Sequence, residues 1–238
     1  MHLELFRRWS ADGVHRALKT DCFEEAFGDD ALLPSVLTSS RTWFAMDVSH
    51  RTVQKARQRG LDRACFLVSD ARRLAIQSGR LDLVFSNSTL DHFESRDEFD
   101  ASVREMARVL RQGGQLIITL DNPLNPLYWP LRWLSRTRYA PFPMGYTPSP
   151  SRLTRMLESA GFAVAARATL IHNPRLLSTA VCLILRRVLP GGADRAIGWL
   201  LSAFAVLERL PTRDITACFV AVRAVRCAAS TRGSDSTH

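Results

Sequence analysis

Residues 42–70 read TWFAMDVSHRTVQKARQRGLDRACFLVSD, and this stretch decides the fold class. It contains two short apolar runs, Thr42–Met46 and Ala64–Val68, which have the length and composition of buried β-strands. The residues between the runs predict a helix that begins after Ser49 and ends before Gly60. The order strand, helix, strand is typical of a parallel sheet whose strands are joined by crossover helices.

The same alternation continues on both sides of this unit. Ser95 and Glu98 form a capping box, which predicts the start of a helix whose apolar face extends to Leu110. Further strands are expected at residues 14–20, 81–85, 115–120, 162–171 and 215–225, and further helices at residues 23–37 and 151–160. The sequence therefore predicts an α/β fold with a seven-stranded, mostly parallel sheet and helices on both faces.

The composition of the chain changes after the fifth predicted strand. Residues 121–149 are rich in proline and aromatic residues, which predicts an inserted lid. Residues 175–210 predict an insertion of two strongly apolar helices. We expect residues 1–228 to form a single domain that includes both insertions, and residues 229–238 to form a disordered tail.

Composition and charge exclude several classes of protein. The 238 residues are 46% hydrophobic and 23% charged, which is enough apolar material for a core. No charge-free apolar run reaches the roughly 18 residues of a membrane-spanning helix, and the N-terminal residues lack the apolar core of a signal peptide. The five cysteines are scattered, so we expect a reducing compartment and no metal site. These features predict a cytoplasmic protein, soluble or peripheral to the membrane.

Polar side chains follow the predicted strands at the edge where ligands bind in open parallel sheets. Asp47 ends the second strand, where a carboxylate can accept both hydroxyls of a ribose. Asp70 ends the third strand, where it can accept a hydrogen bond from an adenine amine. Ser86 and Asn87 end the fourth strand, and Asp121 ends the fifth. Each residue taken singly is also explained as a cap of a helix or turn, but three polar strand ends in register favour a ligand site.

The segments FAMDVSHRTVQKARQRG, FLVSDARRL, GRLDLVFSNSTLDHF and REMARVLRQGGQLIITLDNP, within residues 42–123, resemble the class I S-adenosylmethionine-dependent methyltransferases. The resemblance implies a Rossmann-like fold and S-adenosylmethionine as the cofactor. By the same resemblance, the cofactor-binding residues are those after the second, third and fourth strands: Asp47 and Val48 at the ribose, Asp70 and Ala71 at the adenine, and Ser86 and Asn87 beside the methionine part.

The end of the first strand departs from this family. The family has an acidic residue and a glycine-rich turn there, whereas this chain has Lys19, Thr20 and Asp21 and no glycine before Gly28. A helix that starts near Asp21 would still offer free backbone N–H groups to the methionine carboxylate, and Lys19 could contribute positive charge. The alternative is that Thr20 or Asp21 is a helix N-cap and that this corner no longer holds the cofactor.

The best-placed catalytic candidate is His92, beside Asp91, just after the fourth strand. Imidazole groups exchange protons near neutral pH, so His92 could act as a base toward the acceptor. A surface histidine at a helix entrance is an equally simple explanation. His172, at the end of the sixth strand, and the pair Asp121-Asn122 are further candidates for contacting the acceptor, although Asp121-Asn122 could also form a turn.

The predicted lid places arginines among aromatic residues. Arg132 lies within YWPLRWLSRTRY, residues 128–139, and Tyr146 follows it. This pattern suits an anionic acceptor, a phospholipid surface or single-stranded nucleic acid, but it is also found in helices that pack through tryptophan. The two apolar helices are expected to cover the sheet, to form a homodimer or to contact a membrane interface.

The leading interpretation is methyl transfer from S-adenosylmethionine to a small or lipid-like, anionic metabolite. The first alternative is a non-catalytic binding or assembly module of the same fold that has lost the cofactor. The second is a nucleic-acid methyltransferase, because the net charge of +9 lies in the C-terminal half. Nucleic acid is the less favoured partner, because no recognisable nucleic-acid-binding module is present.

Overall fold

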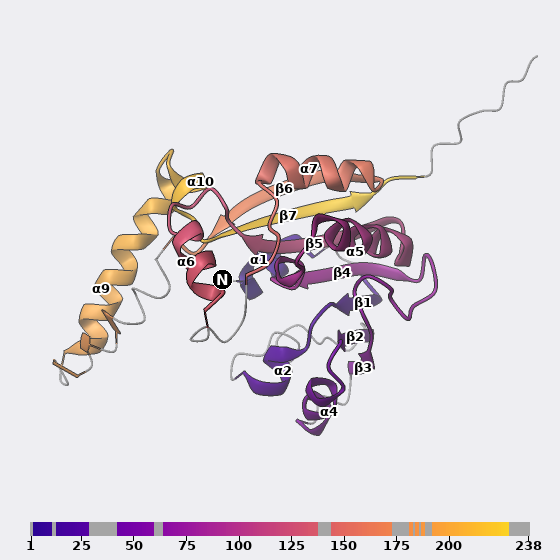
Figure 1. The fold of residues 1–238 in the computed structure, drawn as a ribbon, viewed down its shortest axis with the longest axis horizontal. Helices are drawn as coiled ribbons and strands as arrows, with labels where there is room; N and C mark the ends of the chain where they lie inside the picture. Colours follow the sequence, from indigo (N-terminus) through magenta and orange to yellow (C-terminus); the bar gives the residue numbers. More distant parts are fainter. Residues whose placement is uncertain are drawn as a thin grey trace, which may run out of the picture.

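In a computed structural model, the residues described are 2–10, 13–28, 42–59, 64–137, 144–172, 181–182, 184–185, 187–188 and 192–228. One seven-stranded sheet runs through the protein in the order β3-β2-β1-β4-β5-β7-β6 (Figure 1). The strands are β1 (Arg16–Lys19), β2 (Thr42–Asp47), β3 (Ala64–Val68), β4 (Leu81–Asn87), β5 (Leu110–Asp121), β6 (Phe162–Leu170) and β7 (Phe219–Arg226).

The sheet is mostly parallel, as the sequence predicts. Neighbouring strands from β3 across to β5 are parallel, whereas β7 runs antiparallel to both β5 and β6. The chain passes from β1 outward to β2 and β3, then returns to the other side of β1 with β4 and β5. The strand order therefore reverses between β1 and β4, and this switch point is where open α/β sheets form a ligand crevice.

Helices cover both faces of the sheet (Figure 1). The helices are α1 (His2–Trp9), α2 (Phe23–Phe27), α4 (His50–Gln58), α5 (Arg96–Val109), α6 (Tyr128–Ser135), α7 (Pro150–Ser159), α9 (Ala193–Ala205) and α10 (Arg213–Thr216), with 3-10 turns η1 (Leu90–His92) and η2 (Val206–Arg209). One apolar core packs α5 and α7 against the sheet, and a second packs α1, α2 and α4 against the other face. Alternating side chains of a strand face opposite sides, so both cores draw on the same strands.

The predicted helix caps are present. The Ser49 hydroxyl accepts a hydrogen bond from the backbone N–H of Thr52 at the start of α4. At the start of α5, Ser95 accepts from the backbone N–H of Glu98, and the Glu98 carboxylate accepts from the backbone N–H of Ser95. These local signals were sufficient because each cap depends on residues within one helical turn.

The predicted strand at residues 215–225 is wrong at its start. Residues 213–216 form the short helix α10, and β7 begins at Phe219. Asn122 donates its side-chain N–H groups to the carbonyl oxygens of Asp214 and Ala217, at 2.7 and 2.9 Å. The carbonyl groups of Asp214 and Ala217 are therefore bonded to a side chain and not to a neighbouring strand. This segment packs against the residue that follows β5, and strand pairing begins only at Phe219.

Several expectations fall partly or wholly on residues that the structure does not describe. The predicted helix at residues 23–37 is described only up to Gly28, with α2 ending at Phe27. Of the predicted helix at residues 175–189, the six described residues are helical. Gly60, residues 138–143 of the predicted lid and the predicted tail at 229–238 lie outside the described residues.

Replacing Asn122 with alanine should reduce stability. The side chain is buried, and its Oδ1 atom also accepts a hydrogen bond from the backbone N–H of Leu124. We expect Asn122→Ala to lower the free energy of unfolding by roughly 1–3 kcal/mol, because buried carbonyl groups lose their donors. Urea denaturation measures this loss, with the exposed Gln77→Ala as the control. Unchanged stability would contradict a structural role for Asn122.

Candidate functional site

A cavity of about 470 Å³ lies at the carboxyl ends of β1 to β4, at the switch point of the sheet. Its walls come from four chain segments that are remote in sequence and that each follow one strand. The described lining residues are Thr20, Asp21, Phe23, Glu24, Met46, Asp47, Val48, Ser69, Asp70, Ala71, Arg72, Ser88, Thr89, His92 and Phe93. The parallel strands thus bring these segments together at one edge.

The structure brings seven of the predicted site residues to this cavity: Thr20, Asp21, Asp47, Val48, Asp70, Ala71 and His92. The other predicted residues are not among the described lining residues: Lys19, Ser86, Asn87, Asp91, Asp121, Asn122, Arg132, Tyr146 and His172. The contacts of each group explain the division.

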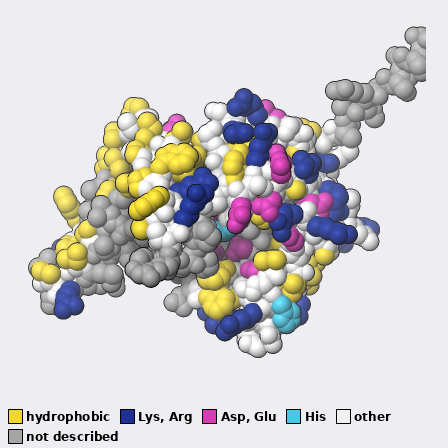
Figure 2. Space-filling view, in the orientation of Figure 1, with side chains coloured by type: hydrophobic (Ala, Val, Ile, Leu, Met, Phe, Trp, Pro, Cys, Tyr) yellow, Lys and Arg dark blue, Asp and Glu magenta, His cyan; other side chains and the backbone are white. Residues whose placement is uncertain are grey.

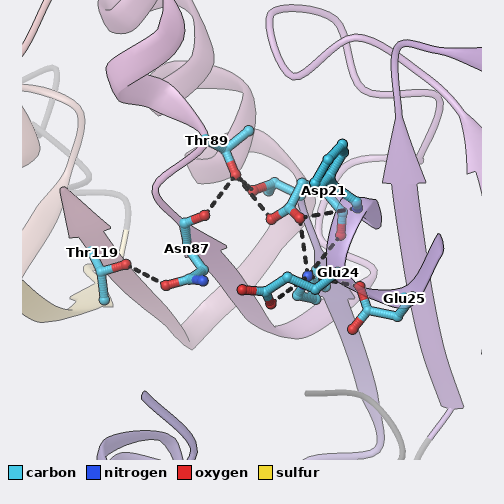
Figure 3. A network of polar contacts seen from close by, with 9 residues as sticks. Asp21, Glu24, Glu25, Asn87, Thr89 and Thr119 are labelled. Carbon is cyan, nitrogen blue, oxygen red and sulfur yellow. Dashed lines mark hydrogen bonds and ion pairs between the residues drawn. The ribbon is translucent and has the colours of Figure 1, made fainter. Parts of the chain in front are cut away.

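The corner after β1 is built around a buried lysine. The Lys19 ammonium lies 2.8 Å from Glu25 Oε2, 3.1 Å from Asp21 Oδ1 and 3.6 Å from Glu24 Oε2 (Figure 3). Burial lowers the pKa of Lys19, but the three carboxylates raise it further, so the net pKa lies above the usual lysine value. Lys19 is therefore a permanent positive charge inside the protein.

This arrangement corrects the expected role of Lys19. Its side chain is fully buried and is surrounded by carboxylates of its own segment, so it does not reach the cavity. Asp21 and Glu24, in contrast, both line the cavity. The N-cap of α2 is Cys22, so neither Thr20 nor Asp21 is the cap residue. Lys19 therefore compensates the negative charge of Asp21 and Glu24 from the protein interior, on the side away from the cavity lining.

Hydrogen bonds join this corner to the end of β4. The Thr20 hydroxyl donates to Thr89 Oγ1 at 3.0 Å, and the Thr89 hydroxyl lies 3.2 Å from Asp21 Oδ2, to which it donates (Figure 3). Thr89 was missed by the sequence reasoning. Its signal was present in the polar run Ser86–Thr89, but the run alone does not show which side chain faces the cavity.

The end of β2 presents Asp47. Its Oδ1 atom accepts the backbone N–H of Ser49 at 2.8 Å, so the side chain is fixed in position by the turn that starts α4. Burial raises the pKa of the Asp47 carboxyl, and backbone N–H groups of Ser49 and Cys22 partly oppose this effect. A fixed carboxylate at this place can accept hydrogen bonds from the two hydroxyls of a ribose.

The end of β3 presents Asp70 together with Arg72, which the sequence reasoning did not single out. Arg72 Nη2 lies 2.6 Å from Asp70 Oδ2, and Arg72 Nε lies 3.0 Å from each carboxylate oxygen. Hydrogen bonds from Arg72 lower the pKa of Asp70 below its usual range, although partial burial opposes this. Arg72 also pairs with Glu98, and its guanidinium lies 5.5 Å from the centre of the Phe93 ring. Asp70 therefore holds Arg72 in the cavity wall.

The end of β4 corrects the expectation for Ser86 and Asn87. The strand continues two residues further than predicted, so Ser86 is fully buried and Asn87 Oδ1 accepts the Thr119 hydroxyl at 2.7 Å (Figure 3). The residues that line the cavity are Ser88 and Thr89. Ser88 has a φ of 47°, a left-handed conformation that is uncommon for residues other than glycine and that redirects the chain into η1.

Asp91 and His92 have separate places in the structure. Asp91 is buried, and its Oδ2 atom accepts the backbone N–H of Asp121 at 3.1 Å. Burial raises the pKa of Asp91, and the nearby His92 partly opposes this. Asp91 thus joins η1 to the end of β5, whereas the exposed His92 lines the cavity. The expected catalytic pair is therefore one cavity residue and one residue that supports its turn.

The predicted acceptor residues do not form one cluster. His172 is buried at the end of β6, and its Nδ1 atom lies 2.8 Å from Thr216 Oγ1, far along the sheet from β1 and β4. Asp121 is at the end of β5, where its backbone N–H binds Asp91, and Asn122 holds α10. These three positions serve contacts of the C-terminal strands, so the structure does not support grouping them around the cavity.

Residues of the predicted lid lie nearer to the cavity wall. The backbone N–H of Tyr146 donates to the carbonyl oxygen of Phe93 at 2.6 Å. The backbone N–H of Gly145 donates to the carbonyl oxygen of Asp91 at 2.7 Å. A Cβ atom on Gly145 would lie 2.1 Å from the Phe93 carbonyl oxygen, so only glycine permits this approach. Arg132 is on α6, where its guanidinium lies 5.9 Å from the Trp129 ring centre. The segment after α6 is thus fastened to η1.

Comparisons with known proteins agree with this geometry. Residues 26–118 match a family model described as a methyltransferase domain. Among solved structures, an S-adenosylmethionine-dependent methyltransferase from Mesorhizobium loti aligns with a TM-score of 0.62 at 15% identity, over 94% of this chain and 96% of that chain. The cyclase SpnF aligns with a TM-score of 0.60 at 21% identity, over 95% and 80% of the two chains.

A third similar structure is phosphoethanolamine N-methyltransferase 2 from Haemonchus contortus, in complex with phosphomonomethylethanolamine and S-adenosylhomocysteine. It aligns with a TM-score of 0.63 at 16% identity, over 95% of this chain and 52% of that chain. At these identities the structural likeness establishes the fold. No curated protein sequence matches the chain.

Removing the Lys19 charge should destabilise the protein strongly. Lys19→Met leaves Asp21, Glu24 and Glu25 without their shared cation, so we expect a loss of about 3–5 kcal/mol in the free energy of unfolding. The loss should shrink from about pH 8 to about pH 5, because protonation relieves the unpaired carboxylates while wild-type Lys19 stays charged across this range.

Urea denaturation at both pH values measures the effect. Lys55→Met is the matched control, because Lys55 is the other lysine of the chain and is exposed, with a cation–π contact to Phe27 at 4.1 Å. Lys55→Met should lower the free energy of unfolding by less than about 1 kcal/mol. Equal losses for the two variants would show that the buried cluster does not stabilise this corner.

Proposed function

Because this chain carries a class I S-adenosylmethionine-dependent methyltransferase domain, we propose that its cavity holds the cofactor and that the chain methylates a small or lipid-like, anionic acceptor. The observation that carries the assignment of the cavity is the convergence of side chains from β1, β2, β3 and β4 at the switch point. A site of this kind requires parallel strands whose carboxyl ends lie at one edge of the sheet, and β1, β2, β3 and β4 are parallel.

The chemistry of the lining fits the cofactor. S-adenosylmethionine carries a sulfonium, an ammonium and a ribose diol, all of which favour carboxylate neighbours. Asp47 would accept the diol, and Asp21 and Glu24 would lie beside the positively charged methionine part. Ala71 and Phe93 would form apolar walls for the adenine. The inward position of Lys19 keeps its positive charge away from the sulfonium.

The bound cofactor supplies the methyl group, and the protein supplies position and proton acceptance. Transfer is an in-line displacement, so most of the rate comes from holding the two reactants in alignment. His92 is on the cavity wall after β4, where it would accept a proton from the acceptor. Hydrogen bonds of Asp91 and Gly145 hold the turn that carries His92, so the position of the base at the cavity wall is fixed.

An anionic acceptor agrees with the lid. Arg132 on α6 is one of several positive groups in a segment that is fastened to η1 through Tyr146. Residues 122–157 contain five arginines and no acidic residue. Guanidinium groups pair well with phosphate and carboxylate. The likeness in fold to a methyltransferase solved with a phosphorylated amine is consistent with this class of acceptor.

Replacing Asp47 with asparagine should weaken cofactor binding without unfolding the protein. We expect the affinity for S-adenosylhomocysteine in Asp47→Asn to fall about tenfold or more, the equivalent of one lost charge-assisted hydrogen bond. Burial raises the Asp47 pKa, so wild-type affinity should fall on acidification at a higher pH than an ordinary aspartate would give. The variant should lack this decline.

Isothermal titration calorimetry across pH measures both effects, with the exposed Asp97→Asn as the control. Full wild-type affinity in Asp47→Asn would remove the carboxylate from the ribose site. An absence of any heat with the wild-type protein would contradict cofactor binding in this cavity.

Replacing His92 should affect turnover and leave cofactor affinity unchanged. For His92→Gln we expect a fall of about 100-fold or more in turnover, the size of a lost general base. Release of S-adenosylhomocysteine, followed by mass spectrometry, measures turnover with phosphomonomethylethanolamine and, as its neutral counterpart, monomethylethanolamine. His50→Gln on α4 is the matched control. Equal rates with the two amines would contradict an anionic acceptor, and near-normal turnover in His92→Gln would contradict the base.

A further inference from the structure

Apolar side chains are exposed at one end of the molecule, on residues that are not among the described lining residues of the cavity. This end consists of α6, α9, η2 and α10, and we call it the apolar arm (residues 124–137 and 192–216). Figure 2 shows apolar side chains gathered along the projecting part at the left, where Figure 1 places α9. Trp133 and Trp199 are 74% and 75% exposed, and Trp129 is 60% exposed. Such exposure of several large side chains marks an interaction surface.

The two parts of the apolar arm are fixed to a common base. Asn122 and Asn125, just before α6, donate hydrogen bonds to backbone carbonyls of α10 and of Ala217. The α10 helix in turn follows α9 and η2 directly in the chain. The exposed tryptophans of α6 and α9 therefore belong to one structural unit at one end of the sheet (Figure 1).

The charge of this region selects the partner. The apolar arm contains five arginines and three acidic residues, so its net charge is positive. Arg136, Arg195 and Arg213 are exposed on the apolar arm, together with Asp194 and Asp214. Indole rings beside guanidinium groups are the composition of surfaces that lie in the headgroup region of an anionic bilayer. A second copy of the chain would instead bring the same excess of arginines face to face.

From these observations we propose that the apolar arm docks onto the surface of an anionic lipid bilayer. Trp133 and Trp199 enter the interfacial region, and the neighbouring arginines pair with lipid phosphates. No helix within the described part of the chain is long and apolar enough to cross a membrane, so the contact is with one face of the bilayer. The proposal does not rest on the methyl-transfer reaction, because the arm residues it uses are outside the cavity.

Co-sedimentation of the full chain with vesicles tests this proposal. We expect binding to phosphatidylcholine vesicles that contain about one third phosphatidylglycerol, and binding about tenfold weaker to pure phosphatidylcholine vesicles. Salt at about 0.5 M should weaken the binding to the anionic vesicles, because it screens the arginine–phosphate contacts. Equal binding to both vesicle types, or no binding to either, would overturn the proposal.

Matched variants locate the contact. Trp133→Ser/Trp199→Ser should weaken binding to the anionic vesicles about tenfold or more. Phe27→Ser/Val68→Ser, which removes two exposed apolar side chains outside the apolar arm, should leave binding unchanged. Thermal unfolding confirms that each variant is folded. Sedimentation equilibrium without lipid gives the oligomeric state: a wild-type dimer that the tryptophan variant dissociates would overturn the proposal in favour of a second copy.

Discussion

The site depends most on the ion pairs between the buried Lys19 ammonium and three carboxylates of its own segment. Three carboxylates within six residues of the chain would repel one another and leave the corner after β1 open. With Lys19 between them, Asp21, Glu24 and Glu25 form a compact turn, and Asp21 is placed where it accepts the Thr89 hydroxyl of the neighbouring strand end. The chain thus closes this corner with charge compensation, at a position where the class I methyltransferases that its sequence resembles have a glycine-rich turn.

Much of the fold could be predicted because its signals are local. Strand runs, the Ser49 and Ser95 caps and the alternation of strands and helices each depend on residues within one element. The parallel order then places the residues that follow β1, β2 and β3 at one edge, so Asp21, Asp47 and Asp70 could be selected as lining residues from the sequence alone. Their charge follows from residue type, and their proximity follows from topology.

The remaining features depend on contacts between distant residues or on where a strand ends. Because β4 extends two residues further than predicted, Ser86 is buried, Asn87 is bonded to Thr119, and Ser88 and Thr89 line the cavity in their place. The bonds of Asn122 reach residues more than ninety positions away, which no local pattern reports. The direction in which Lys19 points is decided by Glu25, which the sequence reasoning did not weigh. The exact end of a strand and the partner of a buried side chain depend on the folded surroundings, so the residue type at one position does not predict them.

The protein has two surfaces with different chemistry. The cavity is acidic and lies at the switch point, whereas the apolar arm is rich in arginine and tryptophan. A crystal structure of the protein grown with S-adenosylhomocysteine would show whether the cavity binds the cofactor with the corner after β1 unchanged. We expect the ribose at Asp47, the amino acid end of the ligand beside Asp21, and Lys19 still bonded to its three carboxylates. A ligand bound elsewhere, or a corner after β1 that must rearrange with Lys19 released, would contradict this expectation.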